Sequence, residues 1–184
     1  MRYEKGEKID YLVTFLEMTQ SPEFDWPKNP HGLKMRLIRV ENPSFEYFMF
    51  LYRLVGSDYE WTDMLDLSFD EVTNFLKDQN VLMYSLLRED VALGFFILDN
   101  REKTLCDLTY FGLIPEAIGN GLGSYLLKSA VKIGWGIEQL EKMTVNTNTL
   151  DHPRALPLYL KVGFKTTEVQ SHSRIAKSSN KDHR

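Results

Sequence analysis

The most constraining part of the sequence is a strand pattern that passes through a glycine-rich turn into a helix pattern. Residues 105–113 (LCDLTYFGL) are rich in residues that favour a strand. The turn then holds Gly119, Gly121 and Gly123, which can take backbone conformations closed to other residues. A helix is predicted over residues 121–135, where Leu122, Leu126, Leu127, Ala130 and Val131 share one face. The turn therefore lies where a strand of a sheet passes into a covering helix.

Glycine-rich turns at the start of a helix commonly bind phosphate groups, because backbone amides and the helix dipole point at the ligand. A P-loop is excluded, since no lysine follows Gly123. A dinucleotide fingerprint fits poorly, because the glycine spacing is G-x-G-x-G and Ser124 stands where its last glycine would be. From the turn alone, a connection that binds no ligand is an equally good interpretation.

The order of the remaining elements predicts an α/β (α+β) fold: a mixed, mostly antiparallel sheet with helices on both faces. Three strand runs separated by short polar turns form an antiparallel meander before the glycine turn. Strands are predicted at residues 11–19, 33–40, 81–87, 91–98, 104–113, 142–147 and 164–170, and helices at 43–55, 69–77, 121–135 and 154–162.

Two helix starts have recognisable caps. Asn42 followed by Pro43 is typical of an N-cap with proline at the first helical position. Ser68 and Glu71 have the spacing of a capping box, in which each side chain binds the other residue's backbone amide.

We expect three regions along the chain. Residues 1–32 form an N-terminal extension with an extra strand, 33–170 form the main domain, and 171–184 form a poorly ordered tail with few large apolar groups. The extra strand either lengthens the sheet or pairs between the subunits of a homodimer. The sequence leaves both arrangements open.

Composition narrows the class of protein. A chain of 184 residues with net charge −4 and no basic cluster outside the tail is not expected to bind nucleic acid. No apolar run approaches the roughly 18 residues that span a bilayer, and no secretory signal is evident, so no membrane partner is expected. The single cysteine, Cys106, suits the reducing cytoplasm, and no Cys/His group has the spacing of a zinc site, so no metal is expected.

A second motif near the C-terminus gives the turn a context. Gly121 and Gly123 match a pattern found in one enzyme family, Q/R-x-x-G-x-G/A. Ile118 stands at the first position of that pattern, where Gln or Arg is usual. The pattern N-x-x-A-x-x-L-Y-x-K-x-G-F is matched at Ala155, Leu158, Tyr159, Lys161, Gly163 and Phe164, with His152 in place of the Asn. In this order and spacing the two motifs resemble the GCN5-related N-acetyltransferases, over about residues 33–170.

This resemblance implies acetyl-CoA as co-substrate and a splay between the strand ending at Leu113 and strand 142–147. The pantetheine arm would pair with backbone at Phe111, Gly112 and Leu113. The pyrophosphate would lie on the amides of Gly119, Asn120, Gly121, Leu122, Gly123 and Ser124, with Ile118 at the edge of that site. His152, Ala155 and Leu158 would complete the cofactor site.

The resemblance also gives Tyr159 as the acid for the leaving sulfur, against the alternative of a buried structural tyrosine. Asp107, a carboxylate in an apolar strand, is a candidate base; a cross-strand partner or a solvated face is the alternative, and ordered water could replace it. Asn146 is a candidate for holding substrate or water. The acidic and aromatic segment 58–66 would suit a cationic amine, unless it is simply a surface loop.

The expected function is transfer of an acetyl group to a primary amine of a small molecule or a protein, by direct attack in a ternary complex. Two alternatives stay open: an idle acyl-CoA-binding or sensor domain, and an interaction module that only shares the fold.

Overall fold

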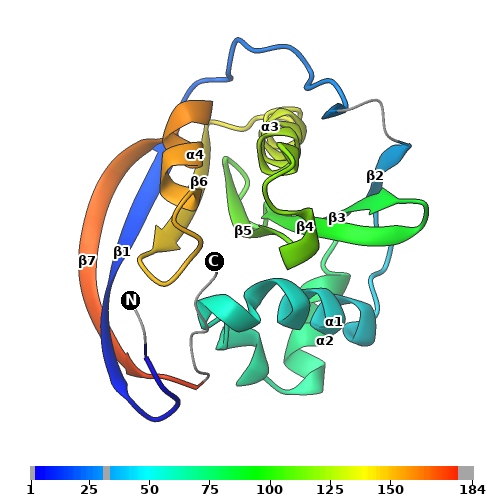
Figure 1. Cartoon of the computed structure of the whole chain (residues 1–184). Helices are drawn as coiled ribbons and strands as arrows, with labels where there is room; N and C mark the ends of the chain where they lie inside the picture. Colours follow the sequence, from blue (N-terminus) through cyan, green and yellow to red (C-terminus); the bar gives the residue numbers. More distant parts are fainter. Residues whose placement is uncertain (1–2, 31–33, 178–184) are drawn as a thin grey trace.

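The computed structural model describes residues 3–30 and 34–177, which form one seven-stranded sheet with helices on both faces (Figure 1). The strands are β1 (Lys8–Met18), β2 (Met35–Arg39), β3 (Val81–Arg88), β4 (Val91–Asp99), β5 (Leu105–Leu113), β6 (Lys142–Asn148) and β7 (Lys165–Ile175). The helices are α1 (Phe45–Gly56), α2 (Phe69–Lys77), α3 (Leu122–Gly134) and α4 (Ala155–Val162). The predicted fold class is confirmed.

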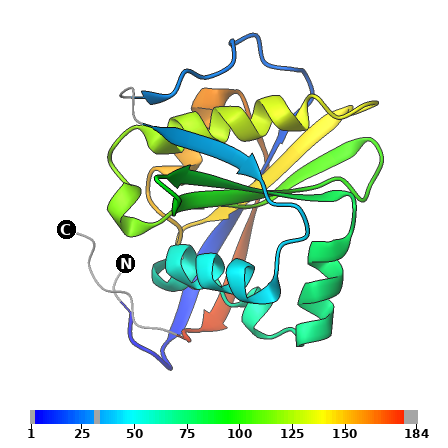
Figure 2. The same cartoon turned by 90° about the vertical axis from the view of Figure 1, so that its right-hand side faces the viewer.

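The strand order is β2-β3-β4-β5-β6-β1-β7, and every described pairing is antiparallel except that of β5 with β6. Figure 2 shows α3 on one face of the sheet and α1 with α2 on the other. Helix α4 packs against α3 and β6. The parallel pair of β5 and β6 lies near the centre of the sheet, and the candidate site described below lies between these two strands.

Strand β1 is an internal strand, although it comes first in the sequence. It pairs with β6 from Val13↔Asn148 to Met18↔Met143, and with β7 from Lys8↔Ile175 to Glu17↔Lys165. Of the two arrangements left open, the structure has the strand inside the sheet of its own chain. The predicted N-terminal extension, residues 1–32, therefore contributes a strand to the same sheet as the predicted main domain.

The predicted tail begins too early. Strand β7 continues through Ser171 to Ile175, and Ala176 is buried. These residues are ordered by main-chain pairing with β1, which their polar composition did not reveal. The rest of the predicted tail, residues 178–184, lies outside the described residues.

One predicted cap is confirmed and one is wrong. The Ser68–Glu71 capping box is present: the Glu71 amide donates to Ser68 Oγ at 3.3 Å and the Ser68 amide donates to Glu71 Oε2 at 2.8 Å. The N-cap of α1 is Ser44 instead of Asn42, because the Tyr47 amide donates to Ser44 Oγ at 3.2 Å.

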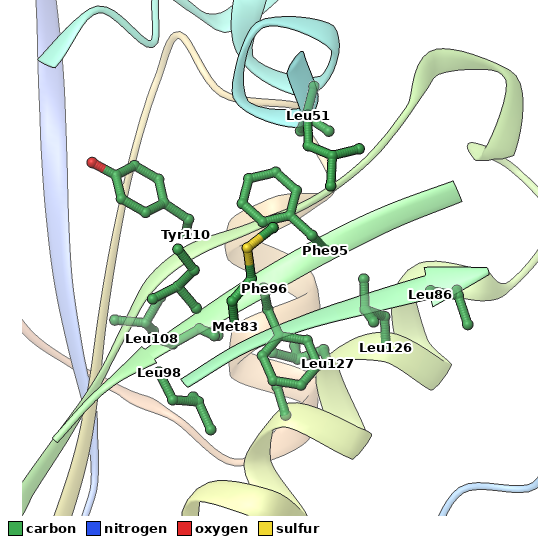
Figure 3. Close-up of a cluster of buried hydrophobic side chains, with 14 of the residues drawn as sticks. Leu51, Met83, Leu86, Phe95, Phe96, Leu98, Leu108, Tyr110, Leu126 and Leu127 are labelled. Carbon is green, nitrogen blue, oxygen red and sulfur yellow. The ribbon is translucent and has the colours of Figure 1, made fainter. Parts of the chain in front are cut away.

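The core lies on both faces of the central strands (Figure 3). Phe95 on β4 points towards Leu51 of α1, and Phe96, its neighbour, points towards Leu126 and Leu127 of α3. These side chains are fully buried. Because β4 is held from both faces, its partner β5 has a fixed position from which to present residues to a site.

Candidate active site

The central feature of the site is a fork between β5 and β6. The two strands pair only at Leu105↔Lys142, Cys106↔Met143 and Asp107↔Thr144. Beyond this point β5 keeps only its pairing with β4, and β6 keeps only its pairing with β1. Two strand edges therefore face each other without pairing, which is the splay that the resemblance implied.

Asp107 ties the strands together at the base of the fork. Its carboxylate accepts hydrogen bonds from Thr144 Oγ1 at 2.6 Å and from Thr109 Oγ1 at 2.9 Å. Burial raises the pKa of the carboxyl, although the two hydroxyls act in the opposite direction. Asp107 does not line the cleft described next.

A cleft of about 620 Å³ lies between the unpaired edges. Of the residues predicted to bind the cofactor, most line it: Phe111, Gly112, Leu113, Ile118, Gly119, Gly121, Gly123, Ser124, His152, Ala155 and Leu158. Asn120 and Leu122 do not line the cleft, and the Leu122 side chain is buried in the core. The two motifs, distant in the sequence, thus meet at one cavity.

The glycine turn presents bare backbone to this cleft. Gly119 has φ +90° and Gly121, the N-cap of α3, has φ +74°, both in the left-handed region. A Cβ atom at either position would meet nothing within 4 Å. Glycine is therefore required here by backbone conformation and not by packing, and the space beside the turn is open to a ligand.

Tyr159 of α4 lines the cleft with a side chain that is only 5% exposed. Its ring packs edge-on against Phe111 and Phe164, with centroids 6.0 and 6.1 Å away. Burial is the main cause that raises the pKa of the hydroxyl, followed by the nearby carboxylates of Asp151 and Asp107. Within the described residues no hydrogen bond reaches this hydroxyl. The alternative of a buried tyrosine with a structural hydrogen bond therefore finds no partner there.

Asn146 and His152 lie on the β6 side of the cleft. Asn146 has an exposed side chain, and it lines the cleft from the middle of β6. His152 Nδ1 accepts a hydrogen bond from the Arg154 amide at 3.1 Å, and its ring lies 6.2 Å from that of Tyr59. Both side chains are therefore positioned beside the cavity.

Sequence reasoning treated segment 58–66 as one acidic loop and did not single out Asp63. Asp63 accepts hydrogen bonds from the hydroxyls of Tyr52, at 2.5 Å, and Tyr110, and it lines the cleft. Burial raises the pKa of both tyrosines, and the neighbouring carboxylate adds to this. Both phenols therefore stay protonated and donate to a carboxylate.

Asp151 connects the two sides of the cleft. It accepts hydrogen bonds from Thr147 Oγ1 at 2.8 Å, from the Asn148 amide at 2.9 Å and from Trp61 Nε1 at 3.3 Å. Burial raises the pKa of its carboxyl. The contact with Trp61 joins the β6–α4 loop to the segment between α1 and α2.

Arg174, placed in the predicted tail, is a cleft residue that sequence reasoning missed. Its Nη1 donates to the Glu60 carbonyl at 3.0 Å, and its Nη2 donates to Thr62 Oγ1. Next to it, the Lys177 amide donates to Glu60 Oε2 at 2.9 Å, and Lys177 Nζ pairs with Asp66 at 2.5 Å. The end of β7 thus holds segment 60–66 beside the cleft.

Other kinds of site find no support in the part of the chain that the structure describes. No cluster of three or more His, Cys, Asp or Glu side chains there could hold a metal ion. Across the same residues, no helix combines the length and apolar character needed to cross a membrane.

Comparison with solved structures shows the same fold at low identity. A Drosophila protein superposes with a TM-score of 0.62 at 11% identity, covering 96% of this chain and 54% of its own. A GCN5-related N-acetyltransferase from Kribbella flavida gives 0.59 at 12%, covering 88% and 56%. The chain thus spans little more than half the length of these two proteins.

A smaller protein is covered more fully. An aminoglycoside acetyltransferase from an uncultured soil metagenomic sample superposes with a TM-score of 0.57 at 17% identity, covering 70% of this chain and 87% of its own. No curated protein matches the sequence. The sequence model of the Acetyltransferase (GNAT) family matches residues 46–164, which include both arms of the fork, the glycine turn and Tyr159. The chain belongs to the GNAT family of acetyltransferases.

Proposed function

We propose that this protein transfers the acetyl group of acetyl-CoA to a primary amine, by direct attack in a ternary complex. One observation carries the proposal. A single cleft, lying between the unpaired edges of β5 and β6, is lined by the glycine turn, by Tyr159 and by the carboxylate of Asp63. The turn leads into α3 on one face of the sheet, whereas Asp63 lies between α1 and α2 on the other. Cofactor and acceptor would therefore enter from opposite faces.

The residues present fit the cofactor. The unpaired edge of β5 at residues 111–113 offers main-chain groups that can bind the amides of a pantetheine arm, as a further strand would. No atom lies within 4 Å of where a Cβ would stand at Gly119 or Gly121, and the amides of this turn lie at the positive end of the α3 dipole. A pyrophosphate bound there would continue directly from the pantetheine.

Tyr159 is the residue that we assign to the leaving sulfur. A neutral amine attacks the thioester carbonyl, the C–S bond breaks, and the sulfur leaves with the electron pair. Because burial raises the pKa of Tyr159 above that of a thiol, the phenol stabilises the thiolate by donating a hydrogen bond and keeps its own proton. We assign Asn146, exposed on β6, to holding the acceptor or a water molecule.

The proton lost by the ammonium group passes to water in this proposal. Asp107 is enclosed by two threonine hydroxyls at the base of the fork and does not line the cleft. A second proton leaves the nitrogen as the amide forms and passes through water to the thiolate, which gives the free thiol of CoA.

The deciding experiment is calorimetric titration with acetyl-CoA of the wild type and of Gly121→Glu, which places a carboxylate where the pyrophosphate would lie. Gly6→Glu is the matched control, because Gly6 also has a positive φ of +91° and open space around its missing Cβ. We expect the wild type and Gly6→Glu to bind and Gly121→Glu to lose binding.

The other outcomes decide between functions. Failure of all three proteins to bind at millimolar ligand would reject the proposal. Equal loss of acetyl-CoA binding in Gly121→Glu and Gly6→Glu would show that backbone strain or the added charge weakens binding wherever it is placed. Binding without transfer to any amine of a broad panel would leave an idle acyl-CoA-binding domain.

A further inference from the structure

Arg174 lies at the end of the cleft that the proposed acceptor would occupy. It lies near the end of β7, where it is paired with Ile9 of β1. Its two terminal nitrogens donate to the Glu60 carbonyl and to Thr62 Oγ1, so the guanidinium is fixed in position. Glu60 and Arg174 both line the cleft.

The guanidinium has no carboxylate partner in the part of the chain that the structure describes. Neither contact is to a carboxylate, because Glu60 accepts through its backbone carbonyl, and no described Asp or Glu forms an ion pair with the guanidinium. A guanidinium has five N–H donors, of which these contacts use two. A fixed cation with donors to spare in a cleft is a ready site for a ligand carboxylate, which arginine binds in a bidentate manner.

The nearby acids are arranged differently. Asp63 and Asp151 also line the cleft, and each is fixed by donors: two tyrosine hydroxyls for Asp63, and Trp61, Thr147 and a backbone amide for Asp151. Glu60 and Arg154 line it as well, so the cleft holds two guanidinium groups and three carboxyl groups in one space. Such a set is complementary to a ligand that carries both a negative and a positive group.

We infer that the acceptor is a small amino acid, whose carboxylate binds Arg174 and whose amino group lies among the carboxylates of the cleft. This inference rests on the proposed acetyl transfer and names its substrate class. A lysine side chain of a protein does not fit, because it has no free carboxylate close to its amine. The segment 58–66, expected to favour a cationic amine, contributes only Tyr59, Glu60, Trp61 and Asp63 to the cleft.

The test compares free amino acids with their carboxamides, which keep the side chain and the amine and replace the α-carboxylate with a neutral amide. The value of kcat/KM is measured for the twenty pairs at saturating acetyl-CoA. We expect the preferred acid to exceed its amide at least tenfold in the wild type. In Arg174→Gln the acid should fall to the level of its amide, while acetyl-CoA binding measured by calorimetry stays unchanged.

Three further variants sharpen the result. Arg36→Gln is the matched control, because Arg36 is an exposed arginine on β2 that pairs with Asp90. Arg154→Gln removes the second arginine of the cleft; loss of the preference there and not in Arg174→Gln would overturn the assignment. If Arg174→Gln fails to fold, Arg174→Lys and the wild-type panel decide, since lysine keeps the charge and loses the bidentate fork.

The two proposals fail differently. Absence of acetyl-CoA binding would remove the acetyltransferase function and this inference together. Two other outcomes would overturn only the inference, provided that acetyl-CoA binds. In the first, amides, polyamines or peptides are acetylated as fast as the free acids. In the second, no amino acid is acetylated at all.

Discussion

The Thr144 hydroxyl donates a 2.6 Å hydrogen bond to the Asp107 carboxylate at the last position where β5 and β6 pair. Thr109, two residues further along β5, donates to the other carboxylate oxygen at 2.9 Å. The fork therefore opens immediately beyond a buried carboxylate held from both strands. This contact lies at the closed end of the fork.

Removing the Thr144 hydroxyl should weaken the base of the fork. In Thr144→Val the carboxylate loses its donor from β6, and a hydrogen bond to a charged group is worth about 1.5–3 kcal/mol. We expect the free energy of unfolding in urea to fall by about that amount. Thr144→Ser, which keeps the hydroxyl, is the control. A valine variant as stable as the serine variant would show that the contact contributes nothing.

The same carboxyl makes stability depend on pH. Burial raises the folded-state pKa of Asp107 above its unfolded value of about 3.9, so the folded protein holds this proton more tightly. The wild type should therefore lose stability relative to Asp107→Asn as pH rises from about 4 through the folded pKa. Urea unfolding of both proteins between pH 4 and 8 measures the difference. A constant difference, or one that favours the wild type at higher pH, would contradict the raised pKa.

Gly112 is required by packing, not by backbone conformation. A Cβ atom there would lie 2.2 Å from Val55 Cγ1, where α1 crosses β5. Gly112→Ala should therefore destabilise the protein by about 1–3 kcal/mol, as overpacking does. Val55→Ala in the same chain should relieve the clash, so that the double variant is more stable than the sum of the two single effects. Simple additivity in urea unfolding would mean that α1 moves away freely.

Tyr159→Phe separates catalysis from cofactor binding. We expect kcat to fall by roughly 10²-fold, as for loss of a catalytic donor, with the Kd of acetyl-CoA unchanged. Stability should also hold, because no described residue hydrogen-bonds the hydroxyl. Tyr125→Phe, on α3 and outside the cleft, is the control. An undiminished kcat on a verified acceptor would remove Tyr159 from the mechanism.

Local patterns in the sequence were sufficient for the local parts of the fold. The Ser68–Glu71 box, the meander of three strands and the strand–glycine turn–helix unit depend on neighbours in the chain, and each is present as predicted. The α1 cap shows the limit of such patterns: Asn42 and Ser44 are both good caps, and only the path of the chain decides that Ser44 receives the Tyr47 amide.

Contacts between distant segments could not be predicted in this way. Periodicity identified β1 as a strand, but nothing local indicates that its partners are β6 and β7. For the same reason the polar run after Ser171 gave no sign of the pairing that orders it and brings Arg174 beside Glu60. The proposed cofactor end of the cleft could be predicted because local motifs form it. The other end could not, because it depends on this long-range pairing.

The place of β1 also bears on how the chain folds. Its two partners lie more than a hundred residues further along, at Lys142–Asn148 and Lys165–Ile175. During synthesis the strand must wait until nearly all of the chain has emerged, and closing so long a loop slows folding. The α1-to-β5 part of the sheet has its pairings close in sequence and can form earlier. We expect refolding to be biphasic in hydrogen exchange, with β3, β4 and β5 protected first and the β6–β1–β7 arm, with Arg174 on it, protected last.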